Sequence, residues 1–153
     1  MNAIVIYDSK FGNTERIAKT IGRALEDGFT VRVQSVDETP AIPAGLELLV
    51  IGGPTHAHGM SQPMRTFLKG IPEEALRDVT ALAFDTRFRM PVIISGSAAS
   101  GIAKVLRRNG AKVLRRPESF FVSRSEGHPL EAGEEDRATA WARDVIALLA
   151  PAI

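Results

Sequence analysis

Apolar and polar positions along the first third of the chain predict strands and helices in alternation. Residues 3–7 form a continuous apolar, β-branched run, which is typical of a strand covered on both faces. Apolar side chains then recur at helical spacing from Ile17 to Leu25. Residues 29–36 alternate like a strand near a sheet edge, and residues 46–51 form another buried run. Only a short stretch rich in proline separates these two strands, so the helix expected between them is absent or reduced to a turn.

The rest of the chain continues the alternation. A helix is predicted after Ser61, a suitable cap, and a fourth strand at 79–84. A third helix is predicted from Ser97, and the pattern of 91–95 fits either a short strand or a loop. The fifth strand is expected in two pieces broken near Pro117, because proline cannot donate to a central ladder. The pieces are 112–114 and 119–122, and a last amphipathic helix carries Ala138, Trp141, Ala142, Val145 and Leu149.

Such alternation predicts an α/β fold: a doubly wound, three-layer sandwich with a parallel sheet, in one domain covering residues 1–153. Ligands of these sheets bind beyond the carboxyl ends of the strands. Ligand-binding residues are therefore expected in the segments that follow strands one, three and four.

Composition restricts the chemistry further. The chain has 153 residues, 44% hydrophobic and 24% charged, with a net charge of +1, which is typical of a globular domain. It has no cysteine, which excludes disulfides, thiol catalysis and thiolate-bound clusters, so redox chemistry would need a cofactor. The first residues do not resemble a signal peptide and no apolar run has membrane-spanning length, so we expect a cytoplasmic protein without membrane insertion.

The segment after strand one has the residues of a phosphate-binding turn. It leads directly into a helix, whose free N–H groups can surround a phosphate together with small polar side chains. An ordinary helix cap by Asn13 or Thr14 is the alternative. The pattern fits neither the usual ATP loop nor the dinucleotide loop. The predicted phosphate-binding residues are Ser9, Lys10, Phe11, Gly12, Asn13 and Thr14.

This turn resembles the phosphate loop of the flavodoxin family, Ser/Thr-x-Thr-Gly-x-Thr, with Phe11 where threonine is usual. The element order resembles that of a short-chain flavodoxin over nearly the whole chain. The resemblance implies a five-stranded parallel sheet in the order 2-1-3-4-5 and one bound flavin mononucleotide (FMN).

Two further segments match the family's flavin-flanking loops. In the segment after strand three, Gly-x-Pro-Thr is followed by His56 in place of the family's aromatic residue, so its imidazole would lie against the flavin ring. A metal site at the histidines has little support, because two histidines one residue apart make a poor ligand set. The resemblance implies flavin contacts from Pro54, Thr55, His56, Ala57, His58 and Gly59.

The segment after strand four supplies the second flanking loop, where Phe88 takes the place of a common tyrosine and would cover the outer ring face. A phenylalanine buried in the core is the alternative. Arg87 and Arg89 bring positive charge to a place that is acidic in typical flavodoxins, so we expect the reduced, anionic flavin to form more easily. The predicted contacts here are Asp85, Thr86, Arg87 and Phe88.

The predicted function is therefore an FMN-binding electron carrier. One alternative is a small FMN-dependent NAD(P)H:quinone reductase or protoporphyrinogen oxidase-like enzyme, and another is a flavin-free binding scaffold of the same topology. Expected partners are a redox protein or a small quinone-like substrate, with no nucleic acid. The sequence leaves the oligomeric state open.

Overall fold

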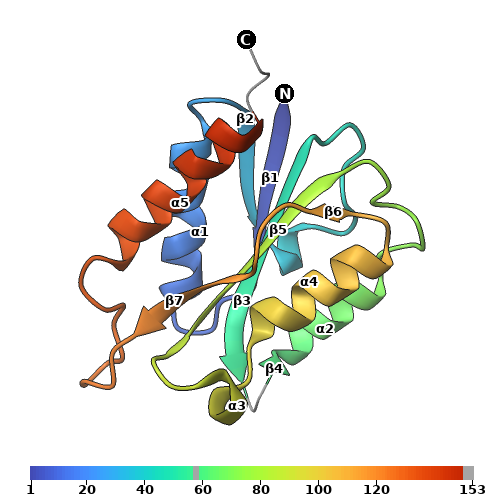
Figure 1. Ribbon diagram of the computed structural model, residues 1–153. Coiled ribbons are helices and arrows are strands. Elements are labelled where there is room, and N and C mark those ends of the chain that lie inside the picture. The colour runs from blue at the N-terminus through green and yellow to red at the C-terminus, as the bar shows by residue number, and fades with distance from the viewer. Residues whose placement is uncertain (57–58, 150–153) are drawn as a thin grey trace.

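A parallel sheet forms the middle layer of the computed structural model, which describes residues 1–56 and 59–149 (Figure 1). Neighbouring strands confirm the expected order 2-1-3-4-5, and the fifth position is shared by two short strands on either side of Pro117. In spatial order the strands are β2 (Thr30–Ser35), β1 (Asn2–Tyr7), β3 (Leu48–His56), β5 (Thr80–Phe88) and β6 (Lys112–Val113), with β7 (Glu118–Val122) also paired to β5.

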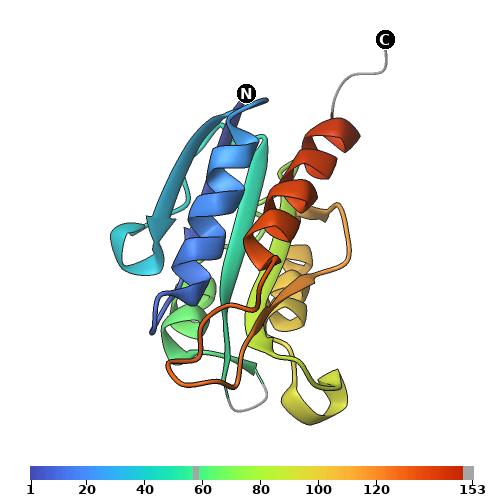
Figure 2. The same ribbon diagram turned by 90° about the vertical axis from the view of Figure 1, so that its left-hand side faces the viewer.

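Helices cover both faces of the sheet, which gives the predicted three layers. Helices α1 (Asn13–Leu25) and α5 (Glu134–Leu149) lie side by side on one face, and α2 (Gln62–Lys69) and α4 (Ala98–Arg108) cover the other (Figures 1 and 2). The interior strands are apolar on both sides because each side faces a helix layer. None of the helices in the described part of the chain is long and apolar enough to cross a membrane.

The connection between β2 and β3 confirms the expected loss of a helix. A 3₁₀ turn at Val36–Glu38 replaces it, and a capping box holds this turn: the backbone N–H of Ser35 donates to the Glu38 carboxylate at 3.1 Å. The crossover is thus a turn followed by an irregular, proline-containing segment.

Three local predictions need correction. The segments after strands three and four were expected to be loops, yet β3 runs on to His56 and β5 to Phe88. Both continue because they find partners: β4 (Gly59–Met60) pairs antiparallel with β3, and β7 pairs with β5 from Phe84 to Phe88. Residues 91–95, expected as strand or loop, include the short helix α3 (Val92–Ser95), in which the Pro91 carbonyl accepts the first helical hydrogen bonds.

Candidate functional site

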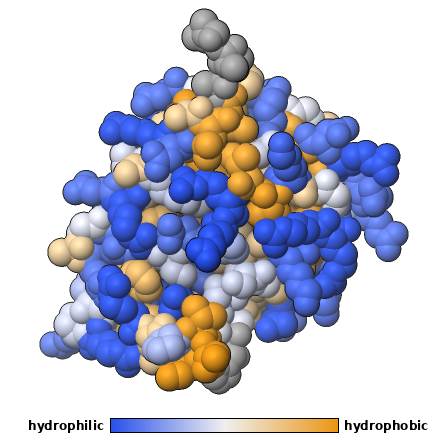
Figure 3. Space-filling view, viewed as in Figure 1, coloured by the Kyte–Doolittle hydropathy of each residue, from blue (hydrophilic) through white to orange (hydrophobic). Residues whose placement is uncertain are grey.

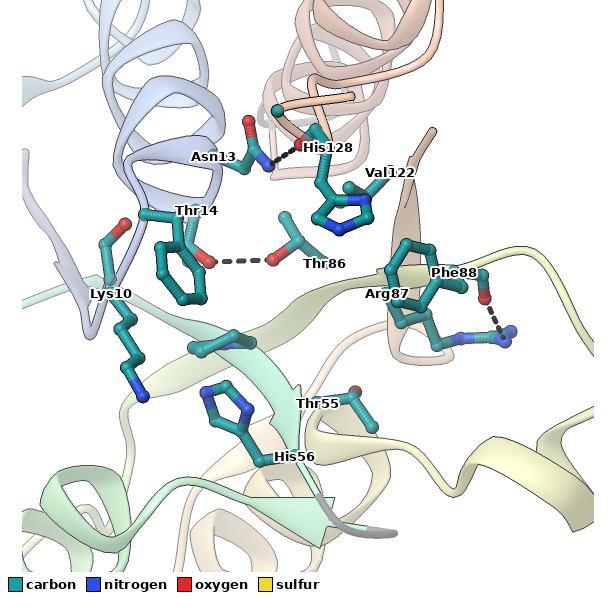
Figure 4. Close-up of a pocket in the computed structure, with 14 residues that line it drawn as sticks. Lys10, Asn13, Thr14, Thr55, His56, Thr86, Arg87, Phe88, Val122 and His128 are labelled. Atoms are coloured by element: carbon teal, nitrogen blue, oxygen red, sulfur yellow. Dashed lines mark hydrogen bonds between the residues drawn. The ribbon is translucent and has the colours of Figure 1, made fainter. Parts of the chain in front are cut away.

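A cavity of about 590 Å³ opens at the carboxyl ends of β1, β3 and β5, where the topology predicts ligand binding (Figure 4). Its volume lies in the range of roughly 300–1,000 Å³ that is typical of small-molecule sites. Each of the three predicted segments contributes to its lining. The predicted residues that line it are Ser9, Lys10, Phe11, Asn13, Thr14, Pro54, Thr55, His56, Thr86, Arg87 and Phe88.

The turn between β1 and α1 is arranged as a cradle of backbone N–H groups. Gly12 takes the helix N-cap position in a left-handed conformation, with φ of 96°, and provides no side-chain cap. The Ser9 hydroxyl serves instead, accepting the N–H of Gly12 at 3.1 Å and that of Glu15 at 3.3 Å. Among the described residues, the N–H groups of Asn13 and Thr14 have no protein acceptor. Two donors at the positive end of a helix are therefore left for an anion.

The side chains of Asn13 and Thr14 are engaged within the protein. The Asn13 amide donates to the backbone carbonyl of His128 at 2.7 Å, and the hydroxyls of Thr14 and Thr86 lie 2.8 Å apart (Figure 4). Both residues thus tie the cradle to neighbouring walls of the cavity. The phosphate contact predicted for Asn13 and Thr14 would therefore come from their backbone N–H groups, while their side chains fix the cradle in place.

Rings stand on opposite walls of the cavity. Figure 4 shows His56, from the end of β3, across the cavity from His128, with Phe88 beside His128. The Phe88 and His128 rings meet edge to face, with centroids 5.4 Å apart and planes at 76°. Phe88 is therefore half-buried in a cavity wall rather than tucked into the core. The space between such walls is suited to a flat aromatic group.

The two arginines of the third segment differ in position. Arg87 lines the cavity, but its guanidinium is held by the Ser119 hydroxyl at 2.9 Å and by the Met90 carbonyl at 2.8 Å. Arg89 is absent from the cavity lining; it pairs with Glu131 at 3.0 Å and lies 4.1 Å from the Phe121 ring centroid. The two guanidinium groups, which the sequence suggested would lie beside the flavin ring, are thus mostly engaged in other contacts.

Three other predicted residues, Gly12, Gly59 and Asp85, do not line the cavity. Asp85 is fully buried, and its Oδ2 atom accepts hydrogen bonds from the hydroxyls of Thr55 and Ser97 and from the N–H of Ala99. It joins β3, β5 and the start of α4 beneath the cavity. Gly12 shapes the cradle without lining the cavity, Gly59 pairs with His56 in the β3–β4 hairpin, and Ala57 and His58 lie outside the described residues.

Comparison with known proteins identifies the family. Residues 5–96, more than half of the chain, match the family model described as flavodoxin. The chain belongs to the flavodoxin family.

Solved structures agree with the flavodoxin fold over nearly the whole chain. Oxidised flavodoxin 1 from Bacillus cereus is similar with a TM-score of 0.80 and 18% identity, over 98% of this chain and 100% of that one. A flavodoxin from the domain Archaea gives 0.74 and 23%, over 97% and 98%. Rubredoxin oxygen:oxidoreductase from Desulfovibrio gigas gives 0.73 and 18%, over 97% of this chain and 36% of that longer one. At these identities the likeness shows the fold alone.

One wall of this flavodoxin-family cavity was missed at the sequence level. Val122, at the end of β7, and Gly127 and His128, in the segment that follows, also line it. This segment has no hydrophobic periodicity and no phosphate or flavin motif, so the sequence pattern gives no sign of it. The rule that ligands bind beyond the carboxyl ends of the strands would have pointed to it, because it follows the fifth strand.

Proposed function

We propose that this flavodoxin-family protein binds one FMN in the cavity and carries electrons by means of it. The observation that carries the proposal is the pair of unengaged backbone N–H groups at Asn13 and Thr14, beside a cavity with rings on opposite walls. An FMN molecule has a phosphate for the first feature and a flat ring system for the second. Once bound, the flavin would supply the redox chemistry, and the protein supplies binding, orientation and electrostatics.

Each part of the site has a role in this proposal. The cradle from Ser9 to Thr14 would hold the phosphate, and the positive end of α1 favours its charge. His56 and Phe88 would lie against the two faces of the ring. Asp85 would act indirectly, since it holds together the strand ends that carry both rings.

Flavin binding is tested first by absorbance. We expect purified protein mixed with FMN to retain flavin absorbance after excess ligand is removed, and to bind FMN more tightly than riboflavin, which lacks the phosphate. Equal affinity for the two would contradict the phosphate role of the cradle. Folded protein that retains neither would overturn the proposal and favour a flavin-free scaffold.

A matched pair of glycine variants separates the cradle from general backbone strain. Gly12 and Gly45 both have positive φ, 96° and 77°, and an added Cβ would meet nothing within 4 Å at either position. Alanine at each therefore introduces the same left-handed strain, about 1–2 kcal/mol. We expect Gly12→Ala to weaken FMN binding by roughly 5- to 30-fold. The reason is that the turn can relax and relieve the strain in the free protein, but must take up the strained conformation again to bind FMN. Gly45→Ala should leave FMN binding unchanged.

A second candidate is a small FMN-dependent reductase acting on a quinone. It is favoured by the charged and titratable side chains of the cavity lining, which in the described part of the chain are Lys10, His56, Arg87 and His128, without a carboxylate. These side chains could bind an anionic substrate or give a proton to a substrate that accepts one. A protein that only carries electrons needs neither. Steady turnover of NADPH with menadione, without a separate reductase, would favour the enzyme; reduction that depends on an added reductase would favour the carrier.

We also propose that a redox protein contacts the tip of α3. Val92, Ile93 and Ile94 expose 50%, 96% and 55% of their surface and form the apolar patch at the lower end of Figure 3. Arg87 joins α3 to the cavity wall, since it donates to Ser95 Oγ at 3.3 Å. Three adjacent, projecting aliphatic side chains fit a concave apolar surface of a protein.

Ile93→Ser should slow reduction by a flavodoxin reductase several-fold and leave reoxidation by ferricyanide unchanged; equal rates with the reductase would refute this contact.

A further inference from the structure

The segment after β7 forms a wall that the three family-like segments do not include. It turns back on itself, because Val122 pairs with Leu130 and the N–H of Ser123 donates to the Pro129 carbonyl at 2.7 Å. Within the turn, the N–H of His128 donates to the Ser125 carbonyl at 2.9 Å. The wall is thus internally hydrogen-bonded at the place where it carries His128.

His128 itself has an unfavourable backbone conformation. Its φ is 46°, in the left-handed region that a residue with a Cβ enters at a cost of about 1–2 kcal/mol. The hydrogen bond from Asn13 to its carbonyl links it to the phosphate cradle and contributes to holding it there. Strain of this kind persists only where surrounding contacts enforce it, and it gathers at functional sites.

The imidazole of His128 has one nitrogen engaged and one available. Nδ1 lies 3.3 Å from the Ser123 carbonyl, so in the neutral ring Nδ1 carries the hydrogen and Nε2 is a free acceptor. Figure 4 shows the ring at the cavity wall with this second nitrogen directed toward the cavity. The Phe88 ring packs edge to face against the imidazole.

The charged groups around His128 come from several elements. Its own segment contributes Glu126 and Arg124, whose guanidinium lies 4.7 Å from the Phe88 ring centroid. The cradle contributes Lys10, β5 contributes the engaged Arg87, and behind the wall Arg89 is paired with Glu131.

We propose that His128 exchanges a proton at Nε2 as the redox state of the bound flavin changes. The inference rests on the proposed function. With a flavin bound, reduction of its ring to the anion would take two electrons from a reductant and one proton from water. A second proton from water then binds Nε2 of His128, and the imidazolium offsets the negative charge of the ring. Reoxidation returns both electrons to the acceptor and both protons to water. Histidine suits this role because its charge changes between pH 5 and 8.

The test measures the reduction potential of the FMN-loaded protein as a function of pH. We expect about two protons taken up per two electrons in the wild type near neutral pH, and about one in His128→Asn. Asparagine is the chosen replacement because it tolerates positive φ, so the wall keeps its backbone.

Nuclear magnetic resonance of the imidazole provides a second measurement. At constant neutral pH, reduction of the FMN complex should move the ring resonances of His128 toward those of a protonated imidazole. Retained FMN with the same proton count in wild type and His128→Asn would overturn the role of His128 and leave the proposed function intact. Loss of FMN from the wild type would overturn both.

Discussion

Gly52 is the position where one methyl group should be felt most strongly. It lies in β3, and a Cβ added there would overlap the Phe84 ring from the neighbouring strand β5. Phe84 is fully buried and cannot easily give way, because its ring meets that of Phe120 edge to face with centroids 6.0 Å apart. Phe120 in turn meets Trp141 of α5 at 6.0 Å. The overlap would therefore be passed from the sheet to the helix layer.

We expect Gly52→Ala to destabilise the protein by about 1–3 kcal/mol, the usual cost of overpacking a close-packed core. At roughly 2–4 °C per kcal/mol for a chain of this size, Tm should fall by about 2–12 °C. Gly53→Ala is the matched control: the same methyl group one residue along the strand would meet only Met64 Cε, at an ordinary 3.5 Å. Urea unfolding of both variants, followed by circular dichroism, measures the difference.

The double variant Gly52→Ala/Phe84→Leu tests the cause. If the ring is what the methyl group meets, the smaller leucine relieves the overlap, and the double variant should be more stable than the sum of the two single effects predicts. Strict additivity, or a Gly52→Ala stability within about 0.5 kcal/mol of that of Gly53→Ala, would refute the reasoning.

Three further predictions concern buried polar groups. Burial opposes ionisation of Glu134, but hydrogen bonds from Arg137 and from a β7 backbone N–H outweigh it and hold its pKa below the ordinary 4.5. Because this pKa is lower in the folded protein than in the unfolded chain, ionised Glu134 stabilises the fold above pH 4.5, and this stabilisation is lost as the pH falls. The difference in free energy of unfolding between wild type and Glu134→Gln should therefore narrow in acid. Burial, and then the hydrogen bond to Glu15, raise the pKa of Tyr7 to about 12. Because Tyr7 is the single tyrosine, its ultraviolet titration should be delayed to that pH, and Glu15→Gln should move it lower. Asp85→Ala leaves the buried N–H of Ala99 and the half-buried hydroxyls of Thr55 and Ser97 without their acceptor and should cost at least about 2 kcal/mol in urea unfolding, while saturating FMN still binds.

The sequence alone determined the order of elements and the end of the sheet where a ligand would bind. Apolar runs such as residues 3–7 can be satisfied only between two helix layers, so they predict an interior parallel strand without knowledge of the partners. The loss of the helix between β2 and β3 was also visible, because the prolines of that stretch leave no room for one. The turn from Ser9 to Thr14 could be singled out from the sequence because it is formed by consecutive residues.

Tertiary structure decided what depends on residues far apart in the chain. The extension of β5 to Phe88 required β7 as a pairing partner, and the wall at His128 required Asn13, more than a hundred residues earlier. The roles of Asp85 and Arg89 also changed once their partners were known, because a carboxylate or guanidinium acts on whatever lies within hydrogen-bonding reach. Local pattern fixes which elements form, since helix and strand periods are properties of neighbouring residues. Long-range packing determines which side chains meet in the cavity, because that depends on how those elements are placed against one another.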